Sequence, residues 1–118
     1  MNKEFVPHQP SLDLKELGFD EPCMAQWNDS NGFDGFGGNY RNSYFTYPDQ
    51  IAVPLYQQAF RWFREKYKLS GLVEIGIHEY SFIIFDEEKD SRKITSSING
   101  TYEEAELECL KKLIEIVK

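Results

Sequence analysis

Acid–base chemistry in this chain would have to start from one of two histidines. His78 lies on the polar face of an alternating segment, LVEIGIHEY, and shares that face with Glu74 and Tyr80. A histidine beside a carboxylate can act as a general base, but no nucleophile motif accompanies this one. His8 lies in residues 1–9, which we expect to be frayed. We therefore predict no catalytic residue, and keep a pocket near His78, serving a small ligand or an enzymatic reaction, as an alternative.

The loop DSNGFDGFGGNY begins like a calcium loop and then departs from that pattern. If Asp29 is the first ligand, Phe33 occupies the fifth position, Asp34 replaces the required glycine and Tyr40 replaces the bidentate glutamate. The glycines do not complete a dinucleotide-binding fingerprint either, because Tyr40 stands where the last glycine would fall. The acidic tract at residues 86–90 is expected to be solvated. The sequence therefore predicts no metal site and no cofactor.

Aromatic side chains in and after this loop form the candidate binding site. Phe33, Phe36, Tyr40 and Tyr44 lie among glycine, asparagine and serine residues. This composition is typical of adaptable recognition surfaces, because aromatic rings supply contact area at a low entropic cost. We expect these four residues to contact a protein or a ligand. The alternative is that the rings pack back onto the sheet.

The charge balance disfavours nucleic acid as a partner. The chain has 13 Lys and Arg against 20 Asp and Glu, a net charge of −7, which repels a phosphate backbone. From Pro54 onward, the predicted order of helix, three strands and helix matches a double-stranded RNA-binding domain. Such domains place basic residues at the start of the last helix, where this chain has Glu103, Glu104 and Glu106. We expect a protein partner instead, with a homodimer as a further option.

Cysteine usage and hydropathy point to a cytoplasmic protein. Cys23 and Cys109 belong to no metal-binding or disulfide pattern, so both are predicted to be buried, reduced thiols. The longest aliphatic or aromatic run covers only residues 82–85, so neither a signal peptide nor a membrane span is expected.

Three segments with helical spacing are expected to carry much of the core. The segment SLDLKELG predicts a short helix with Ser11 as its N-cap and Gly18 as its left-handed stop. The last helix is expected to begin at Thr101, which forms a T-x-x-E capping box with Glu104. Between them, a helix entered at Pro54 has an apolar stripe of Tyr56, Ala59, Phe60, Phe63 and Tyr67.

The strands are predicted from alternation and from β-branched and aromatic residues. Residues 23–27 and 43–47 are expected to pair across the loop. Residues 72–85 exceed the usual strand length and are expected to form two strands. A hairpin around residues 88–90 then leads into a strand over residues 93–98. On the first half of 72–85, the alternation predicts one buried face that consists of Val73, Ile75 and Ile77.

These elements predict an α+β fold in the order α-β-β-α-β-β-β-α. The expected architecture is a small antiparallel sheet of about five strands, with two longer helices on one face and a short N-terminal helix. A length of 118 residues suits one globular domain covering residues 1–118.

Three strings, LKELGFDEPC, QQAFRWFREKYKL and TYEEAELECLKKLIEIV, cover 40 of the 118 residues. In these strings the chain resembles a group of small uncharacterised proteins, a domain of unknown function, from Bacteroides-type gut bacteria and their mobile elements or phages. The resemblance implies no activity, and it assigns no catalytic or binding residue to this chain.

The function we predict is therefore a non-enzymatic, protein-binding or accessory protein of a mobile element or phage. Besides the pocket near His78, a second alternative is an acidic inhibitor or decoy protein, suggested by the small size and the negative charge.

Overall fold

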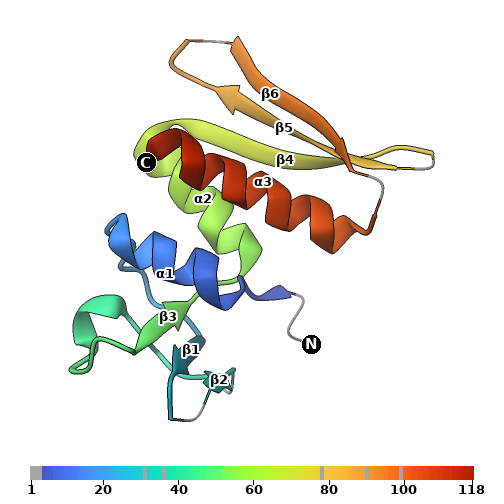
Figure 1. The fold of residues 1–118 in the computed structure, drawn as a ribbon. Helices are drawn as coiled ribbons and strands as arrows, with labels where there is room; N and C mark the ends of the chain where they lie inside the picture. Colours follow the sequence, from blue (N-terminus) through green and yellow to red (C-terminus); the bar gives the residue numbers. More distant parts are fainter. Residues whose placement is uncertain (1–3, 31, 36, 78, 90, 99) are drawn as a thin grey trace. The chain divides into compact units, whose positions relative to one another are not determined.

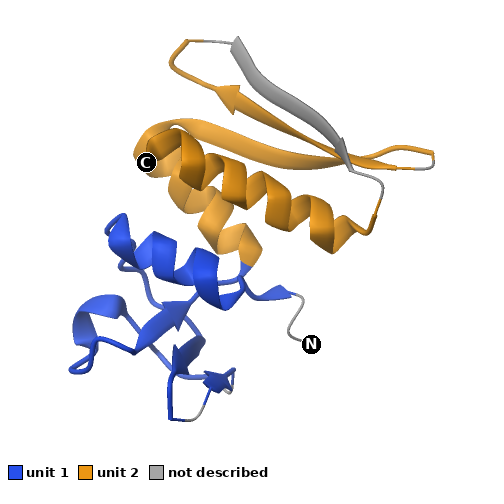
Figure 2. Ribbon diagram, in the orientation of Figure 1, with its two compact units in different colours: residues 1–55 blue, residues 56–118 orange. Residues whose placement is uncertain are grey.

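The computed structural model describes residues 4–30, 32–35, 37–77, 79–89, 91–98 and 100–118, with only the backbone described for 91–98. The helices and strands confirm the predicted α+β class (Figure 1). Contacts within the chain divide it into two compact units, residues 1–55 and residues 56–118 (Figure 2). We therefore describe each unit by itself.

Unit 1 combines one helix with a small antiparallel sheet of order β2-β1-β3. Helix α1 packs on β3, and all three residues of β3 are buried. Gly18, at φ +96°, follows the helix in the left-handed conformation that the sequence predicted for its stop. The elements are α1 (His8–Glu16), β1 (Ala25–Asn28), β2 (Gly32–Asp34), a 3₁₀ helix η2 (Asn42–Tyr44) and β3 (Ile51–Val53).

Two predictions for the start of the chain are wrong. Helix α1 begins at His8 with Pro7 as its N-cap, so Ser11 lies inside the helix. The Ser11 side chain is buried, and its Oγ donates to the Val6 carbonyl oxygen at 3.2 Å. Residues 5–9 are also tied into the unit rather than frayed, because Phe5 forms an antiparallel bridge with Leu55.

The expected strand over residues 43–47 is the other error in unit 1. Residues 42–44 form the 3₁₀ helix, and β1 pairs instead with β2 and β3. Asn42 explains the difference: its Oδ1 accepts from the Ala52 N–H at 2.9 Å, and its Nδ2 donates to the Phe19 carbonyl oxygen at 2.8 Å. The Asn42 amide thus fixes this segment to β3, in place of the backbone pairing with residues 23–27 that the sequence had suggested.

The segment before β3 is further fixed at Asp20. The Ser43 N–H donates to the Asp20 carboxylate at 2.9 Å, and this hydrogen bond lowers the pKa of Asp20. Arg41 donates to the Asp20 carbonyl oxygen from Nε at 3.0 Å and from Nη2 at 2.7 Å.

Unit 2 is an antiparallel sheet of order β4-β5-β6 with two helices packed on it. Figure 1 shows both helices against one face of this sheet. The chain thus has two three-stranded sheets, where the sequence predicted about five strands in one. The elements are α2 (Tyr56–Tyr67), β4 (Leu69–Ile75), β5 (Tyr80–Asp86), β6 (Ser91–Ile98) and α3 (Tyr102–Val117).

The helix-facing side of unit 2 is close-packed. A Cβ added at Gly71 of β4 would lie 2.9 Å from Cys109 Sγ and 3.0 Å from a Leu113 methyl, so α3 approaches the strand too closely for any larger residue. Trp62 of α2, which is not part of the predicted apolar stripe, is also buried. The buried residues of α3 are Ala105, Cys109, Leu110, Leu113 and Ile114.

The segment 72–85 is confirmed as two strands, joined where the Gly76 N–H donates to the Glu79 carbonyl oxygen at 2.8 Å. The burial predicted for Ile75 and Ile77 is wrong, because their exposed fractions are 74% and 92%. Figure 1 shows the reason: this end of the β4–β5 hairpin projects beyond the helices that would have to cover it.

Thr101 is confirmed as the N-cap of α3. Thr101 Oγ1 accepts from the Glu104 N–H at 3.1 Å, and its hydroxyl contacts Glu104 Oε1 at 3.3 Å.

None of the helices in the described part of the chain is long and apolar enough to cross a membrane.

Replacing Thr101 with alanine removes this acceptor from the N-terminus of α3. We expect Thr101→Ala to lower the free energy of unfolding, measured by urea denaturation, by about 1 kcal/mol. Thr101→Ser retains the oxygen and serves as the control. Equal stability of the alanine and serine variants would show that the cap contributes nothing.

Candidate functional site

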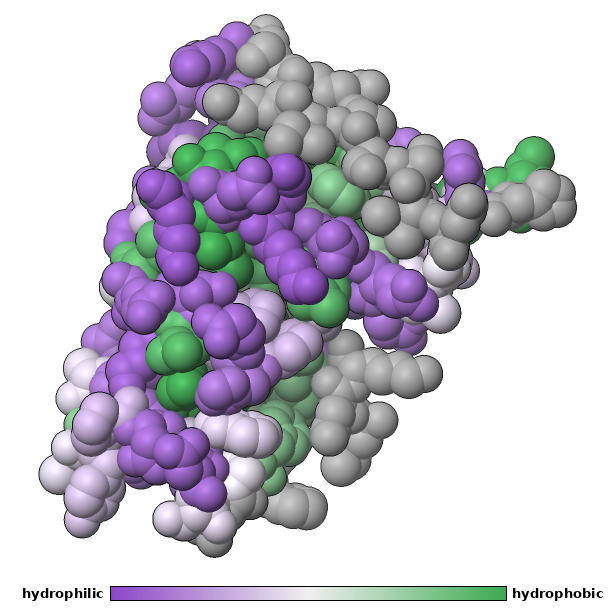
Figure 3. All heavy atoms as spheres, viewed as in Figure 1, coloured by the Kyte–Doolittle hydropathy of each residue, from purple (hydrophilic) through white to green (hydrophobic). Residues whose placement is uncertain are grey.

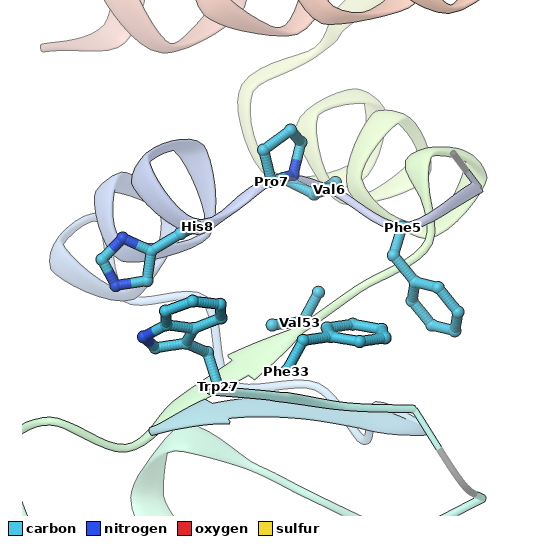
Figure 4. Close-up of a pocket in the computed structure, with 7 residues that line it drawn as sticks. All are labelled: Phe5, Val6, Pro7, His8, Trp27, Phe33 and Val53. Atoms are coloured by element: carbon cyan, nitrogen blue, oxygen red, sulfur yellow. The ribbon is translucent and has the colours of Figure 1, made fainter. Parts of the chain in front are cut away.

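Unit 1 contains an apolar pocket of about 240 Å³ (Figure 4). One wall is the segment that leads into α1, and the other is the sheet. The residues that line the pocket are Phe5, Val6, Pro7, His8, Trp27, Phe33 and Val53.

The N-terminal wall is positioned by backbone pairing. The Val6 N–H donates to the Pro54 carbonyl oxygen at 2.9 Å, next to the bridge between Phe5 and Leu55. These contacts extend the antiparallel arrangement past the end of β3. They hold Phe5 against Phe33 of β2, with the two ring centroids 5.3 Å apart in an edge-to-face arrangement.

The sheet wall follows from the strand register. Trp27 of β1 is the direct cross-strand partner of Phe33 of β2, so the two side chains project from the same face of the sheet. Figure 4 shows both rings below the N-terminal segment, with Val53 of β3 between the two walls.

His8, the first residue of α1, closes one end of the pocket. Its ring lies over Trp27, with the centroids 4.7 Å apart and the planes inclined by 52°. Figure 4 shows the indole nitrogen of Trp27 at this same end. Trp27 Nε1 is buried and has no hydrogen-bond partner within the described residues, and a buried donor left unpaired costs about 1–3 kcal/mol.

The pocket chemistry favours binding over catalysis. Among its seven lining residues, His8 is the one ionisable side chain, and no carboxylate, thiol or hydroxyl side chain lines the pocket. A general base needs a second group that orients it or a nucleophile that it activates. Over the residues that the structure describes, no group of three or more His, Cys, Asp or Glu side chains is arranged to hold a metal ion.

The two cysteines are free and buried, as the sequence predicted. Burial, together with the charge of Glu21, raises the pKa of Cys23 to about 12. Burial, together with the charge of Glu106, raises the pKa of Cys109 to about 12 as well. Because the thiolate is the reactive species, neither residue is a nucleophile at neutral pH.

The four aromatic residues proposed from the sequence do not form one site. Phe33 lines the pocket. Tyr40 is held by two backbone hydrogen bonds to Cys23 at 2.8 Å, and its hydroxyl donates to an Asp34 carboxylate oxygen at 3.3 Å. Tyr44 is 64% exposed. Phe36 lies outside the described residues, and so does His78, around which the alternative pocket was expected.

Of the residues that line the pocket, the sequence pattern indicated only Phe33 as a binding residue. Phe5, His8, Trp27 and Val53 come from separate segments, and the N-terminal segment reaches the sheet only through the bridge near Leu55. The one local signal was the apolar pair Phe5 and Val6 directly before Pro7, which is consistent with a strand that leads into a helix.

Comparisons with protein-family models, with curated proteins and with solved structures found no match to this chain.

The buried thiols predict slow labelling. At pH 8 we expect a disulfide reagent to modify Cys23 and Cys109 on the order of 1,000-fold more slowly in the folded protein than in urea. Because folding raises both pKa values from 9.0 to about 12, their contribution to stability is complete below pH 9 and is lost as the pH rises toward 12. Rapid labelling of the folded chain would contradict the burial of the two thiols.

Proposed function

We propose that this protein is a non-enzymatic binding protein, and that the pocket of unit 1 accepts an apolar side chain of a protein partner. The observation that carries the proposal is the composition of the pocket wall, which combines Phe5, Trp27 and Phe33 with Val53 and a single ionisable group. An apolar group that enters such a pocket is removed from water, which makes the free energy of binding more favourable.

The pocket volume favours one side chain over a larger molecule. Pockets for drug-sized ligands usually measure about 300–1,000 Å³, whereas this one measures about 240 Å³. A cavity of about 150 Å³ can already hold a benzene ring. A phenylalanine or leucine side chain is therefore the occupant that fits best.

The charge of unit 1 favours a basic partner. Residues 1–55 contain eight acidic and three basic side chains, a net charge of −5. Complementary charge around an apolar anchor increases the association rate and suppresses wrong partners. We therefore expect lysine or arginine residues to flank the anchor side chain.

Trp27 supplies a polar contact at the end of the pocket. Its buried, unpartnered indole N–H would gain a hydrogen bond from a carbonyl oxygen of the partner once the anchor displaces the His8 ring that lies over the indole. Such a bond fixes the orientation of the anchor, because a partner without a well-placed acceptor leaves the donor unpaired.

Peptide display on the immobilised full-length protein tests this function. We expect selected peptides to share one aromatic residue or leucine between basic residues. Phe33→Asp should weaken their binding on the order of 10-fold or more in fluorescence anisotropy, because a carboxylate would enter the centre of the contact.

The matched control is Tyr44→Asp, which places the same charge on an exposed aromatic residue outside the pocket. It should change the affinity less than about 2-fold, because rim residues contribute little. Phe5→Asp provides a second pocket variant, and circular dichroism of each variant verifies folding. Peptides that lose affinity only in Tyr44→Asp would place binding on the loop and contradict the proposal.

A further inference from the structure

Strand β4 has an open edge in the described structure. In the order β4-β5-β6, β4 lies at one end of the sheet. The Glu87 N–H donates to the Lys68 carbonyl oxygen at 2.9 Å, and the Gly76 N–H donates to the Glu79 carbonyl oxygen at 2.8 Å. These two hydrogen bonds lie just before and just after β4. Both are made by even-numbered residues, 68 and 76, on the β4 side of the hairpin.

The bracketing bonds show which backbone groups face outward. In an antiparallel pair, every second residue exchanges hydrogen bonds with its partner, and the residues between them point away. The even residues of β4 therefore bond to β5. The backbone N–H and C=O groups of four residues are directed to the open edge: Leu69, Gly71, Val73 and Ile75.

The side chains along this edge are not those of a protected edge. Edge strands are commonly blunted by lysine, proline or a bulge, whereas β4 reads LSGLVEI and pairs with β5 without a register shift. Leu72 is 50% exposed, and Ile75 lies on the projecting hairpin end. Figure 3 shows hydrophobic surface at that end.

A groove of about 350 Å³ runs beside the middle of the strand. Residues 71–73 of β4 form one side, and Phe60 and Arg64 of α2 contribute to the other. Cys109 and Leu113 fill the space over Gly71 itself, so a group carried by an added strand would enter the groove on the side of Phe60 and Val73.

A second copy of β4 fits this edge in a register that uses the whole strand. With Leu72 on a two-fold axis, Leu69 faces Ile75 of the second copy and Gly71 faces Val73 of the second copy. All outward N–H and C=O groups of the strand are then paired. The only charged residue of β4, Glu74, faces the neutral Ser70 of the second copy, so no like charges oppose each other.

We infer that two copies of this protein associate through antiparallel pairing of their β4 strands. This pairing joins the β4-β5-β6 sheet of one copy to that of the other and forms a single sheet of six strands. Val73 of each copy enters the groove beside Gly71 of the other. The two Leu72 side chains cover each other next to Ile83, the cross-strand partner of Leu72 in β5.

The association is expected to depend on salt. Each copy has a net charge of −7, so the two copies repel one another at low ionic strength. Screening reduces this repulsion, because the Debye length falls from ~30 Å at 0.01 M to ~8 Å at 0.15 M salt. The dimer should therefore strengthen as salt is added.

Sedimentation equilibrium of the full chain from about 10 µM to about 1 mM tests the dimer. We expect a monomer–dimer equilibrium that Val73→Pro weakens roughly 10-fold or more. Proline removes an outward N–H and is tolerated where that N–H is not used within the sheet. Val73→Thr retains the N–H and the branched shape, so it should dimerise like the wild type.

Disulfide trapping tests the register independently of proline. Residues that face each other at position 72 form a non-hydrogen-bonded pair, with Cα atoms about 4.5 Å apart, within the ~4.4–6.8 Å range of disulfides. Leu72→Cys should therefore form a covalent dimer under mild oxidation. Glu74→Cys should not, because the two copies of position 74 lie about 13 Å apart.

A wild-type chain that stays monomeric over the whole concentration range would overturn the inference. So would a dimer that forms no disulfide through Leu72→Cys, because association would then involve another surface. A dimer trapped through Glu74→Cys but not through Leu72→Cys would equally reject this register.

Discussion

The pocket of unit 1 depends on one backbone contact, the hydrogen bond from the Val6 N–H to the Pro54 carbonyl oxygen. Together with the bridge between Phe5 and Leu55, it holds the start of the chain beside the end of β3. The same contact places His8 over Trp27, because α1 begins two residues later. Without this contact, Trp27 and Phe33 would form an open apolar patch with only the sheet wall of the pocket.

The two units use their apolar residues in different ways. In unit 1, aromatic rings from the N-terminal segment and the sheet surround a space that they do not fill. In unit 2, Gly71 lets α3 approach β4 closely, and the apolar residues left exposed lie on the strand edge and the hairpin end. A concave pocket suits a single anchor side chain, whereas an open edge suits another strand. Both features are typical of recognition surfaces.

Local patterns predicted the helices and most strands, because those elements depend on residues close in sequence. The Thr101 cap and the two strands within 72–85 are examples. The prediction failed where a distant group decided the structure. Residues 43–47 have strand-like composition, but the Asn42 side chain bonds to β3. Ile75 and Ile77 alternate like buried residues, but the hairpin extends past its helices. Of the aromatic site proposed from the sequence, only Phe33 lines the pocket, since Phe5 and His8 reach it through a tertiary contact.

An isotope-filtered NOE measurement on the full-length protein with a selected peptide tests whether the pocket of unit 1 is the binding site, because it detects which protons of the two molecules lie close together in the complex. We expect contacts from the anchor side chain of the peptide to the rings of Trp27 and Phe33 and to the methyl groups of Val53. Contacts confined to Tyr44 and its neighbours, or to residues 56–118, would show that the pocket is not the binding site.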